Sequence, residues 1–184
     1  MWFLKAKRRK AAEAKSAAFA ERALEARRAN LPAYRRPLDL LANATGRPTD
    51  DVWQAFCRGF LLRGSINEGL ENAFAADARH FSLDWKDSES FTYFSQGVSA
   101  LFPAAAPFEF HAEGLTDPVE SGLRALARWL HARDHALVNI GSDSDTYSCF
   151  VLRRDAAEAL VREGEPPGMR VFDLLHSRYP PPEP

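Results

Sequence analysis

The segment Asp84-Trp85-Lys86-Asp87 combines residue types that can support metal-dependent chemistry. An acidic residue, a spacer and a lysine on a strand form half of a metal-dependent nuclease pattern, in which carboxylates hold Mg²⁺ and the lysine steadies the attacking water. The pattern needs a second acid on a neighbouring strand, but the nearest upstream acid, Asp77, is only seven residues away. A metal-dependent hydrolase or nuclease using Asp84 and Lys86 is therefore an alternative. The main interpretation is a strand end where Trp85 packs and Asp87 caps the next helix.

A second polar cluster, Ser142-Asp143-Ser144-Asp145, lies between two apolar stretches. Closely spaced carboxylates and hydroxyls can bind Ca²⁺ or Mg²⁺. The loop lacks the Asp-x-Asp-x-Asp-Gly…Glu register of an EF-hand. It also misses the Asp-x-Asp-x-Thr motif of haloacid-dehalogenase enzymes, because Thr146 comes one position early. Since Asp and Ser are ordinary turn residues, we predict a structural turn and assign no metal.

The remaining motifs do not specify an active site. His131 and His135 have a zinc-binding spacing if both lie on one helix, but the helix is expected to end between them. Residues 59–65 show the glycine spacing of a Walker loop without its lysine, so no phosphate site is predicted. We therefore assign no catalytic residue, no cofactor and no metal ligand.

Five residues at expected strand ends and turns remain as candidate binding positions, because binding sites concentrate there. They are Trp85, Asp87, Asp143, Asp145 and Tyr147. These positions favour a non-catalytic binding role, with a protein as the expected partner.

The stretch Ala136–Leu152 has the pattern of a buried β-hairpin, two apolar and β-branched runs around a polar turn. From residue 80 onward the expected order is β-α-β-α-β-β-α-β. The strands outside the hairpin are expected at 81–86, 108–111 and 169–174, and the helices at 88–102, 118–130 and 155–162. The sequence thus predicts an α+β domain with a mixed sheet of about five strands, and helices within 49–78 close the remaining surface.

The amino-terminal segment differs from the rest in composition. Residues 5–29 consist mainly of Ala, Lys, Arg and Glu, all strong helix formers, with an apolar face too thin to bury firmly. We predict an exposed or loosely docked helix that ends at Asn30 and Pro32, followed by a connector over 31–48 with one short helix at 38–44. The expected organisation is a basic helical arm (1–30), a single α+β domain (31–176) and a Pro-rich flexible tail (177–184).

Charge is unevenly distributed along the chain. The whole sequence has 24 Lys and Arg against 25 Asp and Glu, yet residues 1–28 hold nine basic and three acidic side chains. Trp2-Phe3-Leu4 beside the basic residues of 5–10 could insert at an anionic membrane surface, and the same arm could bind nucleic-acid phosphates. A peripheral membrane protein is therefore a further alternative. Docking of the arm on its own body or on another subunit stays open.

Composition favours a soluble, cytoplasmic protein. The 46% apolar residues, which include 13 Phe, are sufficient for one core. Cys57 and Cys149 lie far apart within apolar patterns, as reduced core thiols of a cytoplasmic protein do. No apolar run approaches the roughly 18 residues of a membrane span, and the start lacks the apolar region of a signal peptide.

Two resemblances follow from these motifs. Leu83-Asp-Trp-Lys86 and the later Leu137–Tyr147 hairpin resemble an uncharacterised bacterial family, a domain of unknown function, over roughly residues 80–175. That family implies no catalytic residue. The hairpin is also similar to the Gly-Asp-x-Tyr hairpin of the SMI1/KNR4-type immunity superfamily, although Asp143-Ser-Asp145 replaces its glycine-rich turn. This second resemblance implies a bacterial protein that binds and neutralises toxins through its surface.

Overall fold

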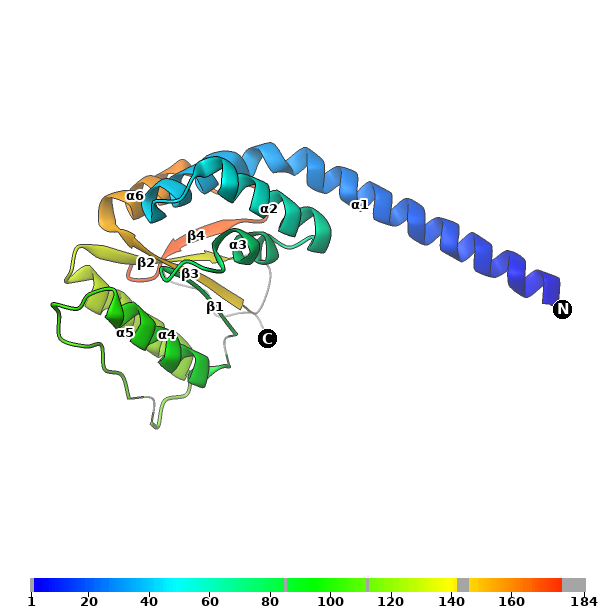
Figure 1. The fold of residues 1–184 in the computed structure, drawn as a ribbon. Helices are drawn as coiled ribbons and strands as arrows, with labels where there is room; N and C mark the ends of the chain where they lie inside the picture. Colours follow the sequence, from blue (N-terminus) through cyan, green and yellow to red (C-terminus); the bar gives the residue numbers. More distant parts are fainter. Residues whose placement is uncertain (1, 85, 112, 142–145, 177–184) are drawn as a thin grey trace.

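The computed structural model describes residues 2–84, 86–111, 113–141 and 146–176, with side chains from residue 13 onward. Its elements in chain order are α1 (Trp2–Thr45), α2 (Thr49–Arg63), α3 (Ile66–Phe74), β1 (His80–Asp84), α4 (Ser88–Ala100), α5 (Pro118–His131), β2 (His135–Gly141), β3 (Thr146–Arg153), α6 (Arg154–Glu163) and β4 (Arg170–Asp173). The α+β class is confirmed (Figure 1).

Within the described residues, one four-stranded sheet forms the centre of the molecule, in the order β1-β3-β2-β4. Each of the three strand pairs is antiparallel, so the expected mixed sheet of about five strands is corrected in count and in direction. The predicted hairpin is confirmed, since β2 pairs with β3 from His135 opposite Arg153 to Asn139 opposite Cys149.

The strand expected at 108–111 does not form, because its two phenylalanines are held by ring contacts instead of by a neighbouring strand. The rings of Phe108 and Phe110 both contact Phe91 of α4, and Phe108 also contacts Trp129 of α5. The backbone N–H of Phe108 donates to Ser99 Oγ at 2.9 Å. Aromatic residues two apart in sequence therefore share one side of an irregular segment.

Helices cover both faces of the sheet (Figure 1). Alternate side chains of the strands enter two separate cores, since successive residues of a strand point to opposite faces. Val138 and Phe150 join the core beneath α1, α2, α3 and α6. Leu137 and Cys149 join the core beneath α4 and α5. The result is a sheet between two helical layers.

Local signals fix the ends of several helices. Asp117 caps α5 by accepting the Glu120 N–H, and Pro118 occupies its first turn. Gly64 ends α2 in the left-handed conformation with φ 82°. Helix α2 begins at Thr49 without a side-chain cap, because Pro48 occupies the capping position.

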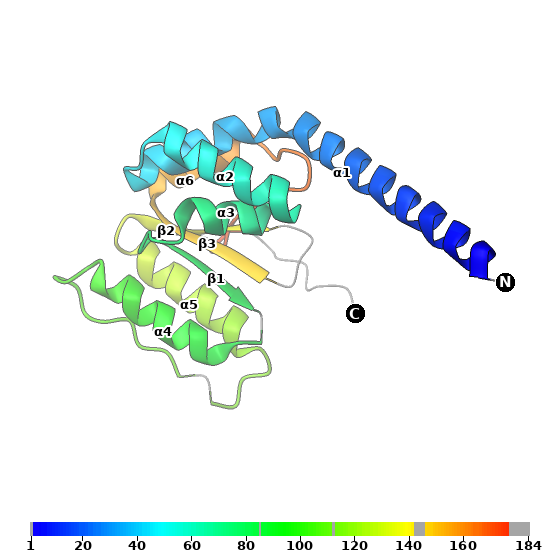
Figure 2. The ribbon, with the colours of Figure 1, turned by 45° about the vertical axis from the view of Figure 1, so that its right-hand side comes forward.

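Helix α1 departs most from expectation. It continues through Pro32 and Pro37 to Thr45, so both the predicted end at Asn30 and the connector over 31–48 are wrong. Each proline removes an N–H donor and costs a helix interior about 3 kcal/mol. Packing offsets this cost, because Tyr34 and Leu38 are almost fully buried against the body. The amino-terminal half of α1 projects away from the body (Figures 1 and 2).

Candidate functional site

Sheet register brings together the two segments that the sequence singles out. Asp84, the last residue of β1, pairs with Thr146, the first residue of β3, and Leu83 pairs with Tyr147. The end of β1 and the start of β3 consequently lie side by side at one end of the sheet (Figure 2). We call this region, together with Lys86, Asp87 and the first residues of α4 up to Ser90, the acidic sheet end.

Local hydrogen bonds hold the turn after β1. Asp84 Oδ1 accepts the Lys86 N–H at 2.9 Å. Asp87 Oδ1 accepts the Ser90 N–H at 2.9 Å, and the Ser90 hydroxyl donates to Asp87 Oδ2. These bonds from Ser90 lower the pKa of the Asp87 carboxyl. The predicted cap by Asp87 is confirmed.

A surface hollow of about 480 Å³ opens beside this turn. Its lining comprises three carboxylates, one ammonium group and one hydroxyl, from Asp84, Lys86, Asp87, Ser88 and Glu89. All except Asp87, which is half-buried, are exposed. The hollow is therefore a shallow, negatively charged surface feature.

The other predicted binding positions are divided between the core and the undescribed segments. Trp85, Asp143 and Asp145 lie outside the described residues. Tyr147 is only 7% exposed and belongs to the core beneath α4 and α5. Among the five candidates, Asp87 is thus the one that the structure places on an accessible surface.

The described residues do not assemble a metal centre. No three His, Cys, Asp or Glu side chains within that part of the chain lie close enough together to hold a metal ion. His131 ends α5 and its ring contacts His176, whereas His135 begins β2 and its ring contacts Phe102. The two histidines therefore do not share a face.

A buried polar group within the sheet has no counterpart in the sequence predictions. His80 Nε2 lies 3.1 Å from Ser148 Oγ, and the ring contacts Phe74 and Phe150. Burial lowers the pKa of His80 to about 4. The imidazole is consequently neutral at pH 7. The burial of His80 could not be predicted from the sequence, because a single histidine at the start of a strand belongs to no recognisable motif.

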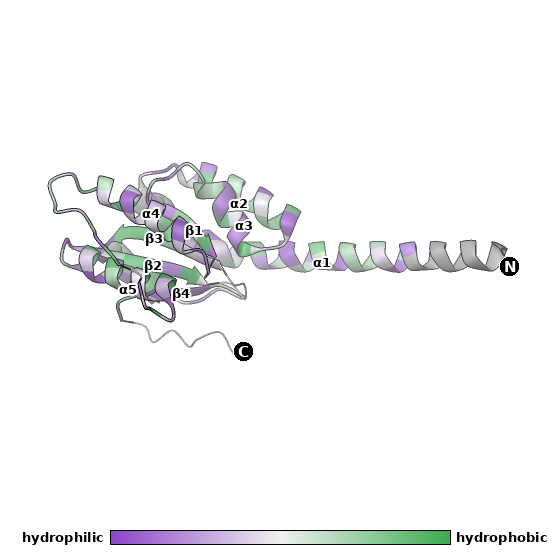
Figure 3. Ribbon diagram, turned by 90° about the horizontal axis from the view of Figure 1, so that it is seen from below, coloured by the Kyte–Doolittle hydropathy of each residue, from purple (hydrophilic) through white to green (hydrophobic). Residues whose placement is uncertain are grey.

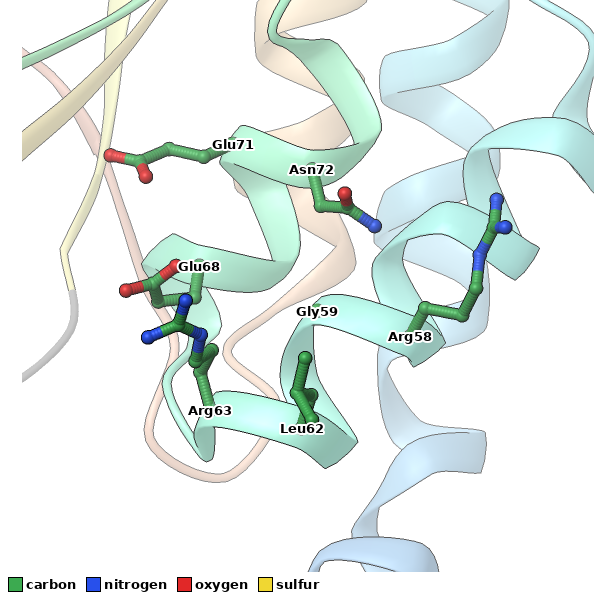
Figure 4. A pocket seen from close by; sticks show the side chains of 7 residues that line it. All are labelled: Arg58, Gly59, Leu62, Arg63, Glu68, Glu71 and Asn72. Atoms are coloured by element: carbon green, nitrogen blue, oxygen red, sulfur yellow. The ribbon is translucent and has the colours of Figure 1, made fainter.

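A second hollow, of about 560 Å³, lies between α2 and α3 (Figure 4). Its lining residues are Arg58, Gly59, Leu62, Arg63, Glu68, Glu71 and Asn72. Figure 4 shows Arg63 and Glu68 at one edge and Arg58 at the other. Leu62 is 78% exposed. The sequence does not indicate this exposure, because Leu62 lies within an apolar run.

The Walker-like glycines of this segment have structural roles. A Cβ on Gly59 would lie 2.5 Å from the Glu68 carbonyl oxygen of α3, so glycine allows the two helices to approach closely. Gly64 provides the helix cap described above. Neither position forms a phosphate-binding loop.

Comparison with known proteins then places the chain. The family described as a domain of unknown function (DUF6630) matches residues 9–174. The chain belongs to this family. The resemblance to an uncharacterised family is thereby confirmed, and the DUF6630 match extends well beyond residues 80–175, into α1. No curated protein and no solved structure matches the chain. Across the described residues, no helix is both long and apolar enough to cross a membrane.

Proposed function

We propose that this DUF6630 protein is a non-catalytic protein-binding module of the bacterial cytoplasm, with the acidic sheet end as its contact surface. The observation that carries the proposal is the register of β1 with β3, which sets the turn after Asp84 beside Thr146. The end of β1 and the start of β3 thereby lie side by side, and the exposed charged residues Asp84, Lys86 and Glu89 lie at this end of the sheet.

The charge of this surface defines its partner. Asp84, Asp87 and Glu89 outnumber Lys86 in the hollow, so a partner with a basic patch complements it. Complementary charge accelerates encounter and excludes partners of like charge. A basic protein, such as the toxin of an immunity pair, fits this description. Two free cysteines support a reducing compartment.

The alternative function, metal-dependent hydrolysis through Asp84 and Lys86, lacks a supporting observation. Such a site needs carboxylates converging on an open metal position. Asp84 Oδ1 instead accepts a hydrogen bond from the backbone of its own turn. The geometry of the described residues therefore favours binding over catalysis.

Charge reversal at the acidic sheet end tests the proposal. The double variant Asp84→Lys/Glu89→Lys should lose the partners that the unmodified full-length protein captures by crosslinking in a bacterial lysate. Glu158→Lys/Glu165→Lys is the matched control, since both residues are exposed. Glu158 lies in α6, and Glu165 follows the end of that helix. Equal capture by both variants would contradict the proposal.

Thermal unfolding with and without Mg²⁺, Mn²⁺, Ca²⁺ or Zn²⁺ separates binding from hydrolysis. A metal at about 100 times its dissociation constant stabilises a protein by about 2.7 kcal/mol. We expect no shift in the unfolding midpoint. A shift that disappears in Asp84→Ala would support the hydrolase instead.

A further inference from the structure

Helix α4 presents an exposed face that is almost free of charge. It lies in the helical layer that faces the viewer in Figure 3. We call its exposed residues from the first turn onward the α4 face; they are Glu89, Thr92, Tyr93, Gln96, Gly97 and Ala100. The exposed residues of α2 and α6 are mostly charged, whereas the α4 face has one charge, at its amino-terminal end. Depletion of charge is typical of the centre of a protein interface.

Tyr93 is the large side chain of this face. It is 75% exposed, and its ring contacts the ring of Phe94 at a centroid distance of 6.2 Å. Phe94 in turn stacks on Phe81 of β1, so the neighbour of Tyr93 is held on the sheet. Tyrosine is enriched among the residues that dominate binding energy, because it offers a large contact area with few rotatable bonds. Tyr93 therefore suits the role of an anchor for a partner.

Gly97, one turn after Tyr93, has no packing role within the chain. Glycine weakens a helix interior relative to alanine, so a glycine there needs a reason. At each of the three other glycines inside helices, Gly59, Gly69 and Gly122, a Cβ would lie 2.6 Å or less from another residue. At Gly97 a Cβ would meet nothing within 4 Å. Close approach of a partner's backbone would account for this glycine.

Charge next to the α4 face indicates the chemistry of that partner. Glu89 belongs both to this face and to the acidic sheet end, where Asp84 and Asp87 line the same hollow. Glu89 and Tyr93 are four residues apart and are therefore neighbours on the helix surface. An arginine that pairs with the Glu89 carboxylate can also lie over the Tyr93 ring, since guanidinium groups bind carboxylates and stack on aromatic faces.

We propose that the α4 face is the centre of the contact with the basic protein that the acidic sheet end attracts. An arginine of the partner lies between the Glu89 carboxylate and the Tyr93 ring, and an uncharged segment of the partner packs against Gln96 and Gly97. This inference rests on the function proposed above and deepens it. The acidic sheet end accelerates encounter with the partner, and the α4 face supplies most of the affinity.

Calorimetric titration with the purified partner tests the inference. The probe is the protein that crosslinks to the unmodified chain but not to Asp84→Lys/Glu89→Lys, identified by mass spectrometry. Tyr93→Ala should raise its dissociation constant at least about tenfold, whereas Tyr93→Phe keeps the ring and should raise it less than about threefold. Val161→Ala is the control, because Val161 is an exposed apolar residue of α6, and it should leave the dissociation constant unchanged.

Two further variants test the details of the contact. Gly97→Ala should also weaken binding, because its methyl group occupies the space of the partner's backbone. Its thermal unfolding should occur at the same or a higher temperature, since a Cβ meets nothing inside the chain. Damage to the fold therefore cannot explain the weaker binding. The effects of Glu89→Gln and Tyr93→Ala should be less than additive, because one arginine contacts both residues.

The outcomes separate this inference from the proposed function. A basic partner that requires Asp84 and Glu89 but tolerates both Tyr93→Ala and Gly97→Ala would overturn the inference and leave the proposed function standing. A captured protein without a basic surface, or no protein lost on charge reversal, would overturn both. A dimer in sedimentation equilibrium that Tyr93→Ala dissociates would also overturn the inference, because a second copy would then cover the α4 face.

Discussion

At the scale of single residues, the least expected group is His80, a titratable side chain inside the sheet. Its ring lies between Phe74 and Phe150 with Ser148 as hydrogen-bonding partner. A carboxylate cluster or metal would give such a histidine a catalytic role. Within the described residues, the His80 ring contacts two aromatic rings and one hydroxyl, so the consequence of its burial lies in its titration. It makes folding stability depend on pH.

The pH dependence has a definite sign. Burial lowers the pKa of His80 from 6.5 to about 4, so between these values the unfolded chain binds a proton that the folded chain excludes. The free energy of unfolding therefore decreases as pH falls from 6.5 to 4, by about 3 kcal/mol in total. His80→Phe should remove most of this loss, measured by urea unfolding at several pH values. The exposed His111→Gln serves as control and should leave the slope unchanged.

At the scale of elements, α2 and α3 are joined by close approach at two glycines. Gly59 of α2 faces the Glu68 carbonyl oxygen, and a Cβ on Gly69 of α3 would lie 2.6 Å from the ring of Phe56. Phe56 in turn stacks on Phe60 and contacts Tyr34 of α1. The spacing between these helices thus determines how α1 packs on them.

Gly59→Ala should destabilise the protein by about 1–3 kcal/mol, because the methyl group meets backbone that cannot move aside without separating the helices. Gly97→Ala in α4 is the matched control. A Cβ there meets nothing within 4 Å, so the substitution should be neutral or stabilising by up to about 1 kcal/mol. Urea unfolding measures both. Equal effects would contradict the close packing of α2 on α3.

At the scale of the whole molecule, α1 connects the projecting arm rigidly to the body. Pro32 lies within the helix where the arm leaves the body, between the partly buried Leu31 and the buried Tyr34. A break in the helix at this proline would allow the amino-terminal half of α1 to move relative to the body. A continuous helix holds the amino-terminal half of α1 in a fixed direction relative to the body.

Pro32→Ala tests this continuity. In a continuous helix, the substitution restores an N–H donor and should stabilise the protein by up to about 3 kcal/mol in urea unfolding. Pro103→Ala is the control, because Pro103 is exposed in a turn after α4. It should be neutral or slightly destabilising. If both substitutions have the same effect, α1 is interrupted at Pro32.

Sequence by itself determined those features whose physical cause lies within a few neighbouring residues. The cap at Asp117, the cap at Asp87 and the stop at Gly64 each involve backbone groups no more than four residues away. The β2–β3 hairpin depends on alternation and a short turn. From these local signals, the α+β class and most of the helix and strand positions could be predicted.

Only tertiary structure decided the features that depend on distant partners. Helix α1 continues through Pro32 and Pro37 because the body buries Tyr34, Leu38 and Leu41, a stabilisation that local helix propensity does not include. Phe108 and Phe110 alternate as in a strand, but their rings pack on α4 and no strand pairs with them. The end of β1 lies beside the start of β3 because these two strands pair, although they are more than sixty residues apart in sequence. Each of these features depends on packing between residues far apart in sequence, which a short stretch of sequence does not reveal.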